Sequence, residues 1–293
     1  MIEKLIINAD DFGLSDNISH EILNLLNENI INSTSVIING TCNERYLNDL
    51  KYIDKSIKLH LNLIEFKPLT NSHQNYLITN KDGNLENSFF SFFSKSFLLS
   101  KNKIQKLKNQ IKSEILLQIE KYQDYTKKEF IDIDSHQHVH NVPFIYNIIN
   151  SLREEKKIKS IRRCNEIIFK SDFFKLDFSK INNKSVIKKF IFHILNLKNK
   201  KINSLTDFTF GSNENFNINN KKIYSNLKYL NQKKEIKSLE IFCHPGKANI
   251  DEFNDLSSNE NLIKFYTSPD RDKEKIFLRS QNFEEFKLKA STL

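Results

Sequence analysis

The chain has 293 residues, 39% of them hydrophobic and 28% charged, which is enough for one large domain or two ordinary ones. Its formal net charge of +9 comes from lysines scattered along the sequence, without interleaved aromatic residues, and this argues against a nucleic-acid partner. No apolar run approaches the roughly 18 to 20 residues of a transmembrane helix, so we expect no membrane span.

The three cysteines, Cys42, Cys164 and Cys243, are odd in number and lack C-x-x-C spacing. This disfavours a disulfide framework and a zinc ribbon, and it is typical of a cytoplasmic protein. The charged pair Glu3 and Lys4 leads directly into an apolar strand pattern, so we expect no secretory signal peptide.

Strand and helix patterns alternate along the chain. In chain order we expect a strand at 4–10, a helix at 17–29, a strand at 33–39, a helix at 43–51, a strand at 57–63, a helix at 102–124, a strand at 130–133, a helix from Pro143 to about 155, a strand at 158–163, a helix at about 220–232 and a strand at 239–243. Such alternation predicts an α/β fold with a mainly parallel sheet or a (β/α) barrel.

No internal repeat or interdomain linker is visible, so residues 1–293 are expected to form a single domain. Two long segments, near 65–100 and 165–218, interrupt the alternation. Long loops often cover a functional site, but tolerated insertions would look the same. The aromatic stretch Phe89–Phe93 is either an apolar groove or homodimer surface, or a buried loop anchor.

The first strand ends in two adjacent carboxylates, Asp10 and Asp11, followed by Gly13. Strand side chains alternate between the two faces, so this pair would not share one environment if the strand stayed regular. One carboxylate could then hold a metal ion while the other meets water or substrate. An isolated Asp-Asp-Phe-Gly is more often a polar turn, so the interpretation depends on other clusters.

Three further polar clusters follow predicted strands: His60, the segment from Asp134 to His140, and His244. They contain five of the eight histidines. In parallel α/β folds the carboxyl ends of the strands converge on one face, where active sites lie.

One Asp with two His from different strands suits Zn²⁺, Mn²⁺, Co²⁺ or Mg²⁺. Such an ion polarises a carbonyl oxygen and activates water. A neighbouring carboxylate would accept a proton, and a histidine opposite would protonate the leaving group. These residues therefore predict a hydrolytic centre without identifying the bond that is cleaved.

The order of these motifs resembles the YdjC-like carbohydrate deacetylases, the family that contains chitooligosaccharide deacetylase. The resemblance runs from residue 5 to about 271. The segments that carry it are Leu5–Ser15, Ile31–Ser35, His60–Leu63, Asp134–His140, Cys243–Gly246 and Ser268–Arg271.

This resemblance implies a (β/α) barrel, often incomplete or distorted, and metal-dependent removal of acetyl groups from N-acetylated sugars. By correspondence of motifs, the metal ligands would be Asp11, His60 and His136. Asp10 would be the general base, and His244 the acid or oxyanion partner. The family tends to have a basic residue near the site at the position of Arg162 or Arg163.

The chain departs from the family pattern at two places. Lys58 stands where many relatives have glycine, and Gln137 replaces a common histidine. Neither is an expected ligand. His140 is expected to contact substrate or support a ligand, while His138 could be structural, and which of the two points inward stays open.

The sequence therefore predicts a cytoplasmic deacetylase with one divalent metal ion, Mg²⁺ or Zn²⁺ with Mn²⁺ or Co²⁺ as alternatives, acting on an acetylated sugar. One alternative is a phosphoesterase-like hydrolase on a similar barrel, which a two-metal site would favour. Another is an inactive sugar-binding protein, which the presence of both Asp10 and Asp11 argues against.

Overall fold

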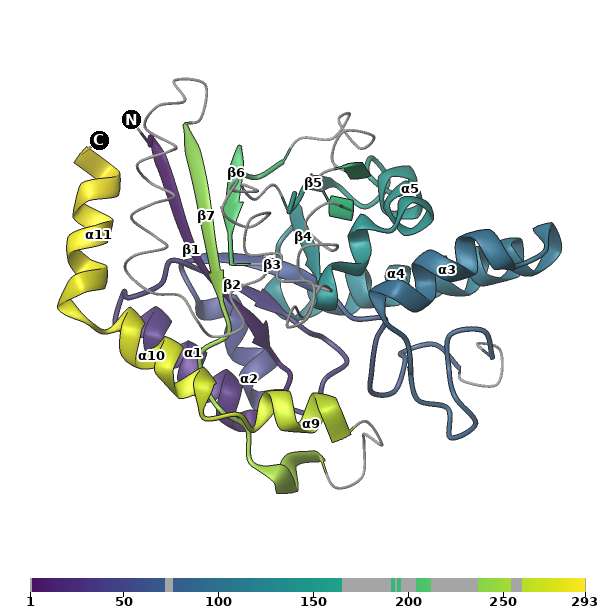
Figure 1. The fold of residues 1–293 in the computed structure, drawn as a ribbon, viewed down its shortest axis with the longest axis horizontal. Helices are drawn as coiled ribbons and strands as arrows, with labels where there is room; N and C mark the ends of the chain where they lie inside the picture. Colours follow the sequence, from purple (N-terminus) through teal and green to yellow (C-terminus); the bar gives the residue numbers. More distant parts are fainter. Residues whose placement is uncertain are drawn as a thin grey trace, which may run out of the picture.

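A computed structural model describes residues 2–71, 76–164, 191–192, 194–195, 204–211, 237–253 and 260–292 of the chain. Seven parallel strands form one sheet in the order β5-β4-β3-β2-β1-β7-β6, curled into a half-barrel (Figure 1). The strands are β1 (Lys4–Phe12), β2 (Ser33–Val36), β3 (Ser56–Leu61), β4 (Ile131–Ser135), β5 (Ile158–Ile161), β6 (Phe208–Phe210) and β7 (Ser238–Cys243). The distorted (β/α) barrel expected from the sequence is thus confirmed.

Helices surround this sheet, with α10 and α11 beside α1 and β1 on one side and the long α4 extending away on the other (Figure 1). The α-helices are α1 (Asp16–Asn27), α2 (Glu44–Asp49), α3 (Phe89–Leu98), α4 (Lys101–Thr126), α5 (Pro143–Ser151), α9 (Glu260–Tyr266), α10 (Asp270–Leu278) and α11 (Gln281–Thr292). Short 3₁₀ segments are η1 (Leu50–Tyr52), η3 (His136–Asn141) and η4 (Ile250–Phe253). No helix within these described ranges is long and apolar enough to cross a bilayer.

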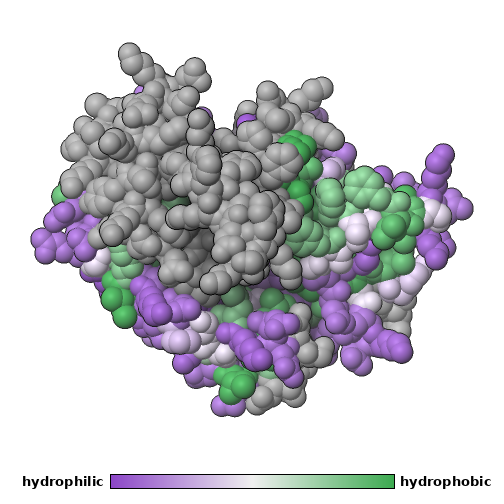
Figure 2. Space-filling model, in the orientation of Figure 1, coloured by the Kyte–Doolittle hydropathy of each residue, from purple (hydrophilic) through white to green (hydrophobic). Residues whose placement is uncertain are grey.

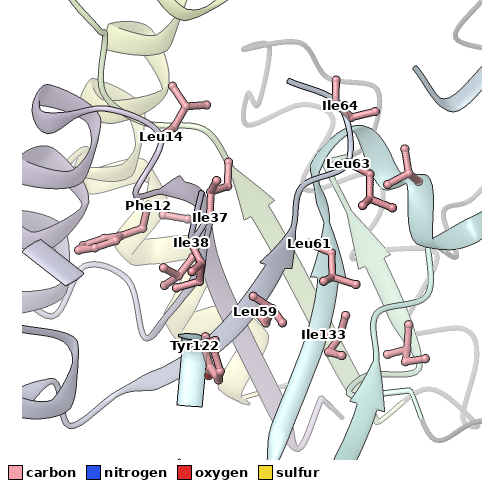
Figure 3. Packing of buried hydrophobic residues seen from close by; sticks show 14 of the residues in the cluster. Phe12, Leu14, Ile37, Ile38, Leu59, Leu61, Leu63, Ile64, Tyr122 and Ile133 are labelled. Atoms are coloured by element: carbon pink, nitrogen blue, oxygen red, sulfur yellow. The ribbon is translucent and has the colours of Figure 1, made fainter. Parts of the chain in front are cut away.

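The two faces of the sheet differ in chemistry because side chains alternate along each strand. One face is apolar and packs against the helices, as Leu59, Ile133 and Tyr122 illustrate in Figure 3. The opposite face is polar although it is equally buried. Register pairs Ser35 with Lys58 and His60 with Asp134 on this face. Buried polar side chains need hydrogen-bond or ionic partners within the protein. This face is therefore where we expect a functional site.

The end of β1 is irregular. Its register with β2 shifts between Ala9 and Phe12, and Asp11 has a φ of 73°, in the left-handed region. Asp tolerates this region better than most residues. The chain then turns at Gly13, where a Cβ atom would lie 2.2 Å from the Ile37 carbonyl oxygen. The kink removes the regular alternation that would have separated Asp10 from Asp11.

The aromatic stretch at residue 89 is a helix rather than a loop. Ser88 and Ser91 form a reciprocal cap at the start of α3, and Phe89 and Phe92 are buried. Phe97 and Leu98 are exposed at its end. Apolar surface also gathers over the region of α3, α4 and α5 in Figure 2. The buried-anchor interpretation thus holds for Phe89 and Phe92, and the homodimer surface stays a prediction.

Other boundaries differ from the expected ones. The strand expected at 130–133 continues to Ser135, and η3 then replaces any extension of it, because Gln137 and His138 have φ values of 50° and 60°. Strand β6 and helices α9 to α11 were not expected. The helix expected at 220–232 and most of the 165–218 segment lie outside the described residues.

Candidate active site

Asp11, His60 and His136 meet at the carboxyl end of the sheet. One ligand atom of each lies within 4.8 Å of those of the other two, and all three side chains are buried. Asp11 comes from the kinked end of β1, His60 from β3, and His136 directly follows β4. The structure therefore brings together the three residues expected to hold a metal ion.

His60 is oriented by a carboxylate on the neighbouring strand. Its Nδ1 lies 2.5 Å from Asp134 Oδ1, and its Nε2 lies 3.7 Å from Asp11 Oδ1. Donation from Nδ1–H to Asp134 would leave the Nε2 lone pair facing Asp11. A carboxylate behind the imidazole is the usual support of a metal-binding histidine.

His136 lies between two carboxylates. Its Nδ1 is 3.2 Å from Asp11 Oδ1, and its Nε2 is 3.1 Å from Glu65 Oε1 and 2.9 Å from the Tyr266 hydroxyl. Burial alone would lower the pKa of His136, but hydrogen bonds to Asp11 and Glu65 raise it to about 10. A cation between His136 and Asp11 would replace this proton.

Asp11 receives a second cationic partner from α10. Both terminal nitrogens of Arg271 lie 3.2 Å from Asp11 Oδ2, while Arg271 Nε donates to the Gly246 carbonyl at 2.6 Å. Burial opposes ionisation, but His136 and Arg271 hold the pKa of Asp11 well below its usual range. Oδ2 thus faces the arginine, and Oδ1 faces both histidines.

Asp10 points to the polar face of the sheet. There it is bound by Arg162, which directly follows β5. Arg162 Nη1 and Nη2 donate to the two Asp10 oxygens at 2.7 and 2.8 Å, and Asn8 Nδ2 donates to Oδ1 at 2.6 Å. Burial opposes ionisation, yet Arg162 lowers the pKa of Asp10. Asp10 is therefore held as an ionised carboxylate next to the Asp11 cluster.

A second possible cation position is formed by Asp10, His60 and Asp134. Arg162 Nη2 already lies 2.7 Å from Asp134 Oδ2 and 2.8 Å from Asp10 Oδ1. The guanidinium supplies the positive charge there, so the Asp11 group is the better position for a metal ion.

The linked side chains carry an excess of negative charge. The buried carboxylates are those of Asp10, Asp11, Glu65, Asp134 and Glu240, and the buried cations are Lys58, Arg162 and Arg271. Once a cation has replaced the His136 proton and the histidines are neutral, the five carboxylates exceed the three cations by two charges. Uncompensated buried charge is strongly destabilising, and one divalent cation would balance it. The charges of this chain therefore fit a metal such as Zn²⁺ or Mg²⁺.

His244 follows β7 and is half-buried beside the cluster, where its ring packs against Phe242 and Phe265. Its backbone N–H donates to Glu274 at 2.6 Å. Burial lowers the pKa of His244 to about 4, although Asp11 and Asp10 act in the opposite direction. A pKa of about 4 favours a neutral ring at neutral pH.

His140 and His138 have different surroundings from His136. His140 Nδ1 lies 2.6 Å from Ser135 Oγ and its Nε2 lies 3.0 Å from the Arg162 carbonyl, so its ring supports the backbone at Arg162. His138 Nδ1 lies 3.4 Å from Cys164 Sγ. Arg163 is half-buried, and it is Arg162 that enters the cluster.

The buried His140 ring predicts a pH-dependent stability. Burial lowers its pKa from an ordinary 6.5 to about 4, so the unfolded chain takes up this proton first as the pH falls. The free energy of unfolding should fall by about 3 kcal/mol between pH 6.5 and 4 from this group alone. Denaturant titrations should show a shallower pH dependence in His140→Asn. Equal pH dependence in both proteins would contradict the assignment.

Sequence reasoning missed several members of the cluster. Lys58 and His60 are two residues apart on β3, as are Asn8 and Asp10 on β1, so alternation places each pair on one face. That signal was available in the sequence. Glu65 and Tyr266 lie beyond the strand ends, and no spacing rule points to them. Arg271 stands in the segment Ser268–Arg271, whose resemblance to the family is the signal that could have found it.

A parallel half-barrel with a buried Asp/His cluster at the carboxyl ends of its strands defines a distorted (β/α)-barrel protein. The model of the family described as YdjC-like protein matches residues 4–288. The chain belongs to this family.

Two proteins of known description are similar to part of this chain. A carbohydrate deacetylase of Xenopus laevis is 28% identical over 162 residues, which are 54% of this chain and 50% of the relative. A chitooligosaccharide deacetylase of Yersinia pestis (strain Pestoides F) is 26% identical over 159 residues, 54% of this chain and 58% of the relative. The chain thus matches about half the length of these relatives.

A solved structure matches the whole fold. It is an Enterococcus faecalis V583 protein named for cellobiose-phosphate cleavage, with a TM-score of 0.67 at 18% identity, covering 99% of this chain and 96% of the other. At this identity the likeness supports the fold alone.

Proposed function

We propose that the chain is a metal-dependent deacetylase that hydrolyses the acetyl amide of an N-acetylated sugar or sugar conjugate. The observation that carries this proposal is the Asp11–His60–His136 cluster beside an ionised Asp10. The names of the curated relatives point to the same substrate class. The family match from 4 to 288 favours treating residues 1–293 as one catalytic domain.

In this proposal Asp11, His60 and His136 hold one divalent ion, either Mg²⁺ or Zn²⁺, with Mn²⁺ or Co²⁺ as alternatives. When bound, the ion polarises the acetyl carbonyl and activates water. Asp134 orients His60, and Glu65 orients His136, each through the imidazole nitrogen turned away from Asp11.

Asp10 serves as the general base. It accepts one proton from the attacking water as the oxygen bonds to the acetyl carbon. The protonated Asp10 then gives this proton to the sugar nitrogen as the C–N bond breaks, so that the amine and acetate are released and Asp10 is ionised again. Arg162 keeps Asp10 ionised and fixes both of its oxygens.

His244 is proposed to stabilise the oxyanion of the tetrahedral intermediate. The sequence left His244 either as a general acid or as an oxyanion partner. A pKa of about 4 favours the oxyanion role, which a neutral imidazole can fill. A neutral imidazole can still donate its N–H to a developing negative charge on oxygen.

His244→Ala should retain the metal and lower kcat by about 10²–10³-fold, the usual loss for one oxyanion donor. Because the oxyanion forms with either leaving group, the loss should be similar on an acetamide sugar and on an activated acetate ester. Parallel kinetics on both substrates measure this. A loss confined to the amide would instead assign His244 as the general acid, since the ester's leaving group needs no proton.

The decisive experiment is acetate release from a panel of N-acetylated sugars, free, oligomeric and conjugated. Each assay is run after chelation and again after adding Zn²⁺, Mg²⁺, Mn²⁺ or Co²⁺. Chelator-sensitive release from at least one sugar would support the proposal. Phosphate release from sugar phosphates without acetate release would overturn it in favour of a phosphoesterase, and binding without turnover would indicate an inactive sugar-binding protein.

A further inference from the structure

Besides the Arg162–Asp10 pair, the polar face of the sheet holds a buried ion pair between Lys58 and Glu240. Lys58 is on β3 and Glu240 on β7, and their side chains are 1% and 0% exposed. Lys58 Nζ donates to Glu240 Oε1. Neither residue contacts Asp11, His60 or His136 in any described interaction, and neither takes part in the proposed reaction.

Arg162 links this pair to Asp10. Glu240 Oε1 accepts from Arg162 Nε at 3.0 Å and from Nη2 at 2.7 Å, in addition to Lys58. The same Nη2 lies 2.8 Å from Asp10 Oδ1 and 2.7 Å from Asp134 Oδ2. One guanidinium therefore serves three carboxylates, and a single Glu240 oxygen accepts from two cations.

The charges around Arg162 indicate what Lys58 contributes. Without Lys58, Glu240 would be a full negative charge in contact with one edge of the guanidinium, in competition with Asp10 on the other edge. Interactions between charges in a dry interior are strong, so this competition would displace Arg162 towards Glu240. With Lys58 present, Glu240 still accepts hydrogen bonds, but its charge is compensated.

We propose that Lys58 is a positioning residue which neutralises Glu240 and thereby keeps Arg162 paired with both oxygens of Asp10. This inference rests on the proposed function, in which Asp10 is the base. Lys58 acts through Glu240 and Arg162, and it does not touch the reacting atoms.

A single variant and a double variant test the proposal. In Lys58→Met, kcat should fall about tenfold or more, as expected for a misplaced base, while KM and metal content stay within about twofold. Glu240→Gln added to Lys58→Met should restore most of the lost kcat, because a glutamine oxygen accepts from Arg162 without a competing charge. Unchanged kcat in folded Lys58→Met, or no recovery in the double variant, would overturn the proposal.

A matched control separates positioning from stability. Glu114 is as buried as Glu240, but it accepts from the backbone N–H groups of Leu69 and Thr70, away from Arg162. Glu114→Gln should lower the melting temperature and leave kcat unchanged. If Lys58→Met fails to fold, the double variant, which removes both charges, is the test, since paired removal is often neutral for stability. Its kcat should then be close to that of the unchanged protein, and a tenfold or greater loss would overturn the proposal.

Crystal structures give a readout that does not depend on activity. The two Arg162–Asp10 contacts of 2.7 and 2.8 Å should be lost in Lys58→Met and present in the double variant. Contacts retained in Lys58→Met would refute the positioning role even if the protein proves not to be a deacetylase. Conversely, their loss in a protein without acetate release would reject the proposed function alone.

Discussion

Alanine in place of Asp11, His60 or His136 is expected to abolish both metal retention and acetate release. The three contribute ligand atoms within 4.8 Å of one another, and Asp11 Oδ1 lies 3.2 Å from His136 Nδ1. Such separations suit atoms around one ion at about 2.0–2.2 Å, the range for zinc. Metal content per chain after gel filtration, together with acetate release, measures the effect.

The matched control is His20→Ala, because His20 is an exposed histidine on α1, on the far side of that helix from its buried residues. It should keep full metal content and activity. Full metal occupancy in all three ligand variants would show that this cluster is not the metal site. Loss of metal with activity retained would separate the metal from the reaction.

Asp10→Asn is the second change with a large expected effect. The amide keeps the shape of the side chain but cannot accept the proton of water, so kcat should fall by about 10²–10⁴-fold. Metal content should be nearly unchanged because Asp10 is held by Arg162 rather than by the Asp11 cluster. Single-turnover and steady-state rates at saturating substrate measure the loss.

Asp132→Asn is the control for this substitution. Asp132 lies on β4, where its carboxylate accepts from Ser160 and has no described contact with Asp10 or Arg162. Its kcat should equal that of the unchanged protein. Near-normal kcat in Asp10→Asn would transfer the role of base to another carboxylate of the polar face, with Asp134 the nearest candidate.

The fold could be predicted where apolar residues recur with the spacing typical of a strand or of a helix. The apolar strand patterns and the amphipathic run at 102–124 gave β1, β3, β7 and α4 within a few residues. Helix α3 was not expected, because its run of phenylalanines is short and its start depends on the local Ser88–Ser91 cap. Helix ends set by tertiary contacts are similarly weakly encoded in local sequence.

The site was predictable where its residues end strands. Asp11, His60 and His136 come together because parallel strands place their carboxyl ends at one edge. Arg271 contacts Asp11 across 260 residues, and Tyr266 contacts His136 across 130, and no local pattern encodes such pairs. The role of Arg162 rather than Arg163 followed only from the geometry at the end of β5.

The left-handed backbone of Asp11 limits how this centre could be rebuilt elsewhere. A designer who copied Asp10, Asp11, His60 and His136 onto an idealised barrel with regular strands would send the two aspartates to opposite faces. The graft would have to include the register shift after Ala9 and the turn at Gly13, since these let both adjacent carboxylates lie near His60. At Asp11 itself, Asn is the tolerable backbone substitute, and β-branched residues at φ 73° would be strained.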